Sequence, residues 1–265
     1  PFGSGQLERA YAVNVGMDQS VFIAGYGKVI FPSFTGSSSV HARDALLARY
    51  ATSGGIIWGL NLDGDIFSEA TDVVGNSVGE CYLSGRMNTL SYIQGDTLDG
   101  NGKVDGMLLK WSPNGTYLWG RAIGGSEDDD LITVSAGDDH SVVAGGLYRG
   151  PIAVGNDSLA AVGGEEALLV KLDSAGNYLW AKGFTGAGDN SIKRVKVAAD
   201  GSIYFGGEFE QTMDIDGTLL TAAANRDIFY GKFNANGTLA WAKSGGGPSM
   251  DFVDDIDIDE DENMY

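Results

Sequence analysis

The sequence is poor in the residues that build many familiar sites: it has one cysteine, two histidines and five prolines. A single cysteine, Cys81, excludes an internal disulfide. His41 and His140 are too few for a three-histidine zinc centre, and no Cys/His ligand spacing accompanies them. Neither a phosphate-binding loop nor a Gly-x-Ser-x-Gly elbow occurs. No apolar run approaches the roughly 20 residues of a membrane span, so we expect no direct membrane insertion.

Basic residues are also scarce, with 17 Lys and Arg against 36 Asp and Glu, a formal net charge of −19. Nucleic-acid binding needs a basic footprint to neutralise phosphates, and an anionic lipid surface attracts basic segments. The charge balance therefore excludes nucleic acid as a partner and disfavours anionic membrane surfaces.

Glycine is abundant, with 41 residues, and it recurs at a fixed period. The string DSAGNYLWAK (173–182) is repeated in outline by SPNGTYLWGR (112–121), NANGTLAWAK (234–243) and, more loosely, ATSGGIIWGL (51–60). A step of 61 residues relates four sets of positions: Trp58, Trp119, Trp180 and Trp241; Gly54, Gly115, Gly176 and Gly237; Arg49, Lys110, Lys171 and Lys232; and Asp44, Asp105, Glu166 and Asp227. A fixed period of this length indicates a repeated supersecondary unit.

Each copy of the repeat has the pattern of four short strands. In the third copy these are 131–136, 141–148, 167–172 and 178–183, with alternating or continuous apolar residues bounded by turns. Gly176 lies where the last turn needs a positive φ. An excursion between the second and third strands (149–164 in this copy) predicts an extra hairpin, and its counterpart at 28–42 in the first copy differs in sequence.

Four antiparallel strands per copy, with no helical period, predict an all-β fold, a β-propeller of four-stranded blades. The blades are expected at 4–64, 65–125, 126–186 and 187–247, with a partial blade at 248–265. The tryptophans are expected to pack between blades. Because Tyr265 lies 61 residues after Tyr204, inside a strand, we expect a segment of a larger propeller in a longer, multidomain chain.

The pattern EALLVKLDSAGNYLWAK (166–182), followed by a Gly-rich step, Asp189 and then GSIYFGG (201–207), resembles the bacterial cell-surface β-propeller repeat family. Such repeats occur in long secreted proteins, notably of Bacteroidetes. The resemblance implies an exposed scaffold and brings no catalytic residues. A weaker similarity joins the tryptophan repeats to the docking motifs of quinoprotein dehydrogenases, without the cofactor-binding residues of those enzymes.

Two acidic stretches are candidate sites. Asp99, Asn101 and Asp105 are spaced like part of a calcium loop, although Lys103 takes a ligand position and no Glu closes the loop, so a plain turn is favoured. DDIDIDEDEN (254–263) continues the register of Val195 and Val197 through Ile256 and Ile258, which predicts a strand with outward carboxylates. A carboxylate pair for glycoside hydrolysis competes with the ordinary turn-capping role of Asp.

These patterns predict a non-catalytic scaffold outside the cell or at its surface, mediating adhesion or assembly with other surface or secreted proteins. No cofactor is expected, and calcium remains a candidate. The alternative is a propeller that binds a glycan or another small ligand, and a propeller enzyme ranks behind both. A ligand site repeated in every blade needs the same exposed polar or aromatic residue at a fixed register. The residues that recur here are turn glycines, tryptophans and strand cations, which favours the scaffold.

Overall fold

The computed structural model describes residues 9–16, 18–27, 44–64 and 66–265. The chain forms two compact units, residues 1–131 and 132–265. Every regular element in the described ranges is a β-strand, and they hold no helix that could cross a membrane. The predicted all-β class is therefore confirmed. The excursion at 28–42, with His41, lies outside the described residues.

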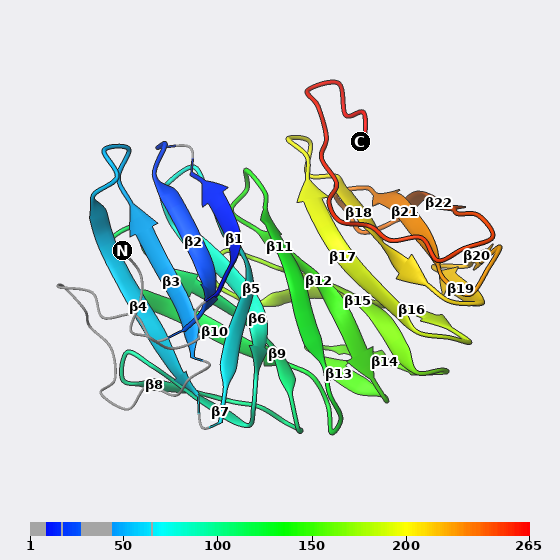
Figure 1. Ribbon diagram of the computed structural model, residues 1–265, viewed down its shortest axis with the longest axis horizontal. Coiled ribbons are helices and arrows are strands. Elements are labelled where there is room, and N and C mark those ends of the chain that lie inside the picture. The colour runs from blue at the N-terminus through cyan, green and yellow to red at the C-terminus, as the bar shows by residue number, and fades with distance from the viewer. Residues whose placement is uncertain (1–8, 17, 28–43, 65) are drawn as a thin grey trace. The chain divides into compact units, whose positions relative to one another are not determined.

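The first unit contains two sheets with the same strand plan (Figure 1). The first sheet consists, in spatial order, of β1 (Arg9–Val15), β2 (Val21–Tyr26), β3 (Ala45–Tyr50) and β4 (Ile56–Gly64). The second consists of β5 (Ser68–Gly75), β6 (Cys81–Met87), β9 (Asp105–Trp111) and β10 (Tyr117–Ile123). Neighbouring strands are antiparallel throughout, so each sheet is a meander of four strands.

The second unit follows the same plan, its first strand beginning two residues before the unit does. The third sheet consists of β11 (Asp130–Ala136), β12 (Val142–Arg149), β15 (Glu165–Leu172) and β16 (Tyr178–Gly186). The fourth consists of β17 (Asn190–Val197), β18 (Ile203–Phe209), β21 (Asp227–Phe233) and β22 (Leu239–Gly245). The four strands predicted for the third copy of the repeat are confirmed, with small differences at their ends.

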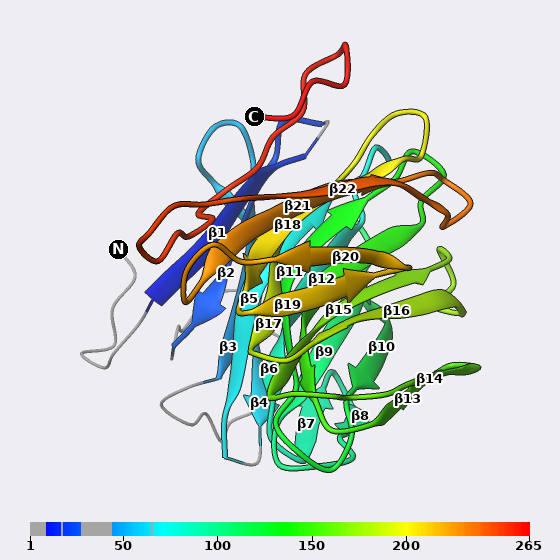
Figure 2. The same ribbon diagram turned by 90° about the vertical axis from the view of Figure 1, so that its right-hand side faces the viewer.

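The predicted excursion hairpins are also confirmed. They are β7 (Leu90–Ile93) with β8 (Asp96–Asp99), β13 (Ile152–Val154) with β14 (Asp157–Leu159), and β19 (Thr212–Ile215) with β20 (Thr218–Thr221). Two of them extend the preceding sheet: β7 pairs with the end of β4, and β19 pairs with the end of β16 (Figure 2). A hairpin from one repeat thus adds two strands to the sheet before it.

The turn between the third and fourth strands explains why its glycine recurs. Gly54, Gly115, Gly176 and Gly237 have φ of 79°, 81°, 81° and 81°. Glycine adopts such angles without a Cβ clash. In the third sheet the Gly176 N–H donates to the Asp173 carbonyl at 3.0 Å, and the turn adds a bulge after Lys171. The bulge places Lys171 directly opposite Trp180, and the same pairing joins the basic residue to the tryptophan in the other three sheets.

The first strands of neighbouring sheets lie against each other inside each unit. In the first unit the Gly75 N–H donates to Asn14 Oδ1 at 3.0 Å. In the second the Val197 N–H donates to Ser135 Oγ at 3.0 Å, and the Val195 N–H donates to Thr133 Oγ1 at 3.4 Å. Each bond joins residues 61 or 62 positions apart. Side chains of one first strand therefore bond backbone donors of the next.

Apolar side chains fill the space between the sheets of each unit. In the second unit the Phe184 ring lies 5.3 Å from Phe205, 6.2 Å from Phe229 and 6.0 Å from Phe233, centroid to centroid. In the first unit a cluster of buried residues joins both sheets, with members such as Leu47, Leu83 and Met107. Burial of these aromatic and aliphatic side chains stabilises the contact between sheets by about 25 cal/mol for each Å² of apolar surface removed from water.

The first copy departs from the common register by one residue. Its turn bond, from the Gly16 N–H to the Ser20 carbonyl, corresponds to the bond from Asn76 to Glu80, a step of 60. In the second unit the corresponding bonds start at Gly137 and Ala198, a step of 61. Phe22 in β2 is therefore the counterpart of Tyr82 in β6.

Candidate functional site

The recurring basic residue lies over an aromatic ring of the second strand. Arg49 lies 5.2 Å from the centre of the Phe22 ring, Lys110 5.1 Å from Tyr82, and Lys232 4.9 Å from Tyr204. A cation above an aromatic face is attracted by the ring quadrupole. These three contacts occupy the same place in three sheets.

A carboxylate completes each of these three arrangements. Lys110 Nζ lies 2.8 Å from Glu80, Lys232 Nζ lies 2.6 Å from Glu262, and Arg49 pairs with Asp18. The hydrogen bond to Glu262 is the main cause that raises the pKa of Lys232 above its ordinary value. Lys232 therefore stays charged at neutral pH and forms a structural ion pair with Glu262.

Two tryptophans lie on the glycine turn of the next sheet. Trp58 Nε1 donates to the Pro113 carbonyl at 3.0 Å, and a Cβ at Gly115 would lie 2.9 Å from its indole. Trp180 meets the turn of the fourth sheet in the same way, since a Cβ at Gly237 would lie 3.0 Å from its Nε1. Within each unit, one tryptophan therefore spans the gap between two sheets.

The other two tryptophans have different surroundings. Trp119 is buried, and its ring centre lies 6.0 Å from that of Tyr82. Trp241 is half-buried between Tyr204 and Tyr230, with centroid distances of 6.4 and 6.1 Å. Trp111, outside the 61-residue series, is fully buried in β9.

The recurring acids have a role that sequence reasoning missed. Asp44, Asp105, Glu166 and Asp227 are at most 2% exposed at the start of each third strand. The Glu166 carboxylate accepts backbone N–H groups of Val162, Gly163 and Gly186 at 2.7, 2.8 and 2.8 Å. Asp105 and Asp227 accept N–H groups of their preceding loops in the same way, so these three acids bind the loop that leads into the strand. The 61-residue step marked them, but the step itself does not say which backbone groups a side chain meets.

The structure places the three candidate calcium residues in different surroundings. One oxygen of Asp105 accepts the N–H groups of Asn101 and Gly102 at 2.9 and 3.1 Å, so the side chain caps its own loop. Asp99 and Asn101 are exposed, whereas Asp105 is fully buried. Burial raises the pKa of the Asp105 carboxyl, and its other oxygen has no hydrogen-bond partner. Calcium at this loop stays a prediction.

His140 lies in a turn and Cys81 lies inside a strand. His140 has a φ of 60° in the turn between β11 and β12. Cys81 is fully buried in β6, and burial raises the pKa of its thiol. In the part of the chain that the structure describes, no group of three or more His, Cys, Asp or Glu side chains is placed to hold a metal ion.

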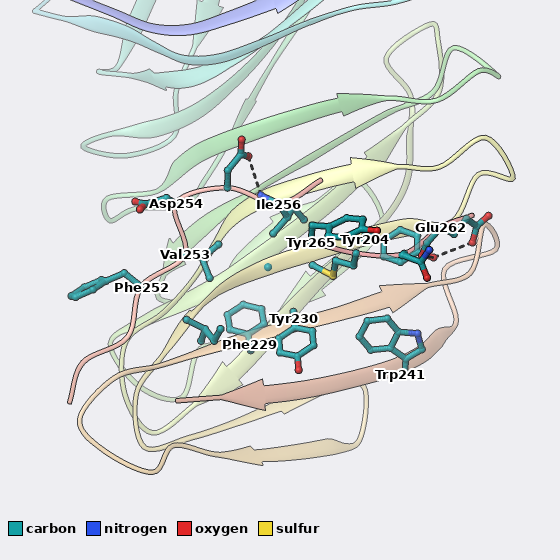
Figure 3. Close-up of a pocket in the computed structure, with 15 residues that line it drawn as sticks. Tyr204, Phe229, Tyr230, Trp241, Phe252, Val253, Asp254, Ile256, Glu262 and Tyr265 are labelled. Carbon is teal, nitrogen blue, oxygen red and sulfur yellow. Dashed lines mark hydrogen bonds between the residues drawn. The ribbon is translucent and has the colours of Figure 1, made fainter. Parts of the chain in front are cut away.

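A groove of about 740 Å³ lies between the fourth sheet and residues 252–265 (Figure 3). Its walls combine aromatic side chains with carboxylates; they include Tyr204, Tyr230, Trp241, Tyr265, Asp254 and Glu262. The Tyr204 hydroxyl donates to Glu262 Oε2 at 3.0 Å, which ties the two walls together. Aromatic faces beside carboxylates suit either a strand from another protein or a carbohydrate.

The prediction of a strand at 254–263 is wrong in its extent. This stretch has only one isolated bridge, Ile258 with Met264, because most of its backbone meets no paired strand. The predicted orientation of the side chains holds in part: Ile256 points inward and is only 6% exposed, whereas the neighbouring Asp257 is exposed. Alternation sets which side chains face inward, but a strand also needs a hydrogen-bonding partner.

The stretch nevertheless repeats the contacts of β17 at a step of 61. A Cβ at Gly145 would lie 2.5 Å from Ile192 and 3.1 Å from Val195. A Cβ at Gly206, 61 residues on, would lie 3.8 Å from Val253 and 3.1 Å from Ile256. Two ion pairs join the new stretch to β17, Arg194 with Asp255 at 3.1 Å and Lys196 with Asp257 at 3.3 Å. Residues 253–258 thus lie on the fourth sheet as β17 lies on the third.

The groove itself was not predicted from the sequence. Its residues come from β18, β21, β22 and the C-terminal stretch, which the local pattern treats separately. The available signal was the step from Tyr204 to Tyr265, which placed the end of the chain in the register of a second strand. Comparison of the sequence with protein-family profiles gives no match. Comparison with curated proteins gives none either.

Proposed function

We propose that this chain is a non-catalytic β-propeller scaffold that acts outside the cell or at its surface, in adhesion or in assembly with other surface or secreted proteins. One observation carries the proposal: the residues that recur every 61 positions are engaged in structural contacts. Three of the four cations lie on rings, three of the four acids bond the loop before their strand, the glycines form turns, and Trp58 and Trp180 join neighbouring sheets. Such use of the repeat favours a rigid framework over a repeated reaction centre.

The propeller arrangement is supported by the contacts between first strands. In a propeller the blades stack around an axis with equivalent strands innermost. Adjacent first strands touch through bonds 61 or 62 residues apart in both units, and four meanders of four strands follow one another along the chain. The resemblance of the repeat to bacterial cell-surface propeller repeats supports a location outside the cell.

A glycan-binding function is the second candidate, favoured by the groove beside the fourth sheet. Tyr204, Tyr230 and Trp241 offer ring faces there, and Asp254 and Glu262 offer hydrogen-bond acceptors for sugar hydroxyls. The second wall of this groove is formed by the C-terminal stretch.

The test is a glycan array and a hydrolase panel, each run with and without calcium. The scaffold proposal expects no turnover of any substrate. Turnover that disappears when one carboxylate pair is replaced, while the fold survives, would overturn it. Saturable binding of a glycan without turnover, lost in Trp241→Ala, would make the second candidate the better description.

A further inference from the structure

A second polar residue lies beside the start of each third strand, where the connection to the next sheet ends. It too recurs at a step of 61, and the four residues are Ser68, Asp129, Asn190 and Asp251. In the third sheet this residue is an amide that serves the recurring acid. Asn190 Nδ2 donates to Glu166 Oε2 at 3.2 Å, beside the Gly186 N–H that donates to the same oxygen at 2.8 Å. The buried carboxylate of the third sheet thus receives a side-chain donor from the connection.

The second sheet has a carboxylate in the place of this amide. Asp129 is 1% exposed and Asp105 is 0% exposed. Asp129 Oδ2 accepts the Gly125 N–H at 2.6 Å, and Asp105 Oδ2 accepts the N–H groups of Asn101 and Gly102. Backbone donors of this kind favour the ionised form of a carboxyl group. Within the described part of the chain, the other oxygen, Asp105 Oδ1, has no hydrogen-bond partner.

This oxygen without a partner is directed toward the second carboxylate. A Cβ at Gly124 would lie 2.2 Å from Asp105 Oδ1 and 2.6 Å from Asp129 Oδ2. The two oxygens are therefore no farther apart than these two distances together. A calcium ion with calcium–oxygen distances of about 2.3–2.6 Å spans a similar gap. Two carboxylates held this close and away from water repel each other unless positive charge lies between them.

The backbone brings the two carboxylates together. The Asp129 N–H donates to the Val104 carbonyl at 2.8 Å, and Val104 forms a parallel bridge with Asp128. At the surface, Lys103 Nζ lies 2.6 Å from Glu127 and joins the same two loops. Because these contacts fix the loops, the two acids cannot separate to relieve their repulsion without breaking backbone hydrogen bonds.

The fourth sheet repeats the main features of this arrangement. Asp227 is 2% exposed, and its Oδ2 accepts the Ala223 N–H at 2.7 Å. Its Oδ1 has no hydrogen-bond partner among the described residues. Asp251 Oδ2 accepts the Gly247 N–H at 2.9 Å, as Asp129 accepts a glycine N–H in the second sheet. The oxygen without a partner thus occurs in both sheets in which the connection ends in aspartate.

We propose that Asp105 and Asp129 bind a calcium ion between the loop that precedes β9 and the connection that follows β10. Calcium takes carboxylate and backbone carbonyl oxygens in irregular geometry, so two carboxylates and the carbonyls of glycine-rich loops can form a site. The site uses the oxygen of Asp105 that is directed toward Asp129, and it does not use the exposed side chains of Asp99 and Asn101. This inference goes beyond the scaffold function and does not depend on it.

The test is a calcium titration of the intact chain in metal-free buffer, measured by isothermal titration calorimetry, with magnesium at matched ionic strength for comparison. We expect saturable calcium binding with a Kd of about 1 mM or below, and weaker binding of magnesium, which demands near-octahedral geometry. Asp129→Asn should weaken calcium binding about tenfold or more. This variant should still fold, because an amide at this place copies the pairing of Asn190 with Glu166.

Asp99→Asn and Asp128→Asn are the matched controls, since each removes one negative charge near the site without removing a proposed ligand. Both should bind calcium like the parent, and circular dichroism and melting temperature establish that each variant is folded. Absence of saturable binding, or unchanged binding in folded Asp129→Asn, overturns the proposal. Loss of binding in either control overturns it as well, because the ion would then be held by the exposed loop or by the general negative charge.

A proton is the other positive charge that could lie between the two carboxylates. Absence of calcium binding, together with a pH dependence of stability that Asp129→Asn removes, would identify a shared proton and overturn the calcium site. Neither result bears on the scaffold function, which the glycan array and the hydrolase panel test separately.

Discussion

Asp105 shows how burial of one carboxyl sets a response to pH. Its pKa in the folded chain lies above the ordinary value because burial disfavours the charged form. A raised folded pKa contributes stability that is fully present below the unfolded pKa, about 3.9, and is lost as pH rises through the folded value. Ionised Asp105 therefore costs stability at neutral pH, although two backbone N–H groups bond one of its oxygens.

We expect Asp105→Asn to gain stability relative to the parent as pH rises from 4 to 7. The amide keeps an acceptor for the two backbone donors and never ionises. Urea unfolding at each pH gives the free energy of unfolding of both proteins. A difference that stays constant with pH would show that burial does not control this carboxyl.

Asp173 supplies a control of opposite sign. Its pKa is lowered, chiefly by the hydrogen bond from Asn177, so its contribution is present above the unfolded pKa and is lost as pH falls. Asp173→Asn should therefore be less stable than the parent at pH 7, and the gap should close toward pH 3. The two Asp→Asn variants together separate the effect of burial on the pH dependence of stability from the effect of hydrogen bonding at the surface.

Trp58 is the residue on which the contact between the first two sheets depends most directly. It is 8% exposed, and its indole bonds the Pro113 carbonyl. Trp58→Ala should lower the free energy of unfolding by about 3–5 kcal/mol, the usual cost of deleting a large buried aromatic side chain. The neighbouring Ile57→Ala, with a side chain 45% exposed, should cost less than about 1 kcal/mol. Equal losses in denaturant titrations would contradict the role given to Trp58.

At the scale of the elements, close packing of β17 on the third sheet leaves no room at Gly145. A Cβ there would lie 2.5 Å from Ile192 Cγ2, whereas a Cβ at Gly206 would lie 3.1 Å from Ile256 Cγ2. Gly145→Ala should cost about 1–3 kcal/mol through overpacking. Gly206→Ala should cost less, because residues 253–258 are held by fewer strand bonds and give way more easily. Urea midpoints of the two variants decide the order, and a larger loss at Gly206 would reverse the argument.

Most elements could be predicted from the sequence because each copy of the repeat fixes its own local features. Apolar alternation marked the strands, and Gly176 marked a turn that needs positive φ. The prediction of a strand at 254–263 failed for a physical reason. The alternation of apolar and polar residues determines which side chains point inward, but a strand forms only where a second backbone segment is in place to hydrogen-bond it. The offset at Phe22 was missed because it arises between Phe22 and Arg49, which are 27 residues apart whereas Tyr82 and Lys110 are 28 apart, and the positions that defined the step all begin at Asp44. The groove was missed for a related reason, since its walls come from four separate segments.

At the scale of the whole molecule, the net charge of −19 is the dominant electrostatic feature. Like charges on one chain repel, and added salt screens them with a Debye length near 10 Å at 0.1 M. We expect the melting temperature to rise between 10 mM and 300 mM NaCl, by ~2–4 °C for each kcal/mol gained. Calorimetric or fluorescence melting measures it, and a falling melting temperature would show that surface ion pairs such as Arg194 with Asp255 outweigh repulsion.

Calcium chloride at matched ionic strength separates screening from binding. If screening alone operates, calcium chloride and magnesium chloride at the same ionic strength should raise the melting temperature equally. A specific site near Asp99 would give calcium a larger rise, which saturates with concentration as ligand linkage requires. Asp99→Asn should abolish that excess.

The strand order of the four sheets has a consequence for how the chain acquires its shape. Within each sheet, the four strands of the meander pair with the strands that lie next to them along the chain. Contacts that are local in sequence cost little loop-closure entropy and form quickly. A sheet can therefore fold once its own repeat is available, without waiting for strands from distant parts of the chain.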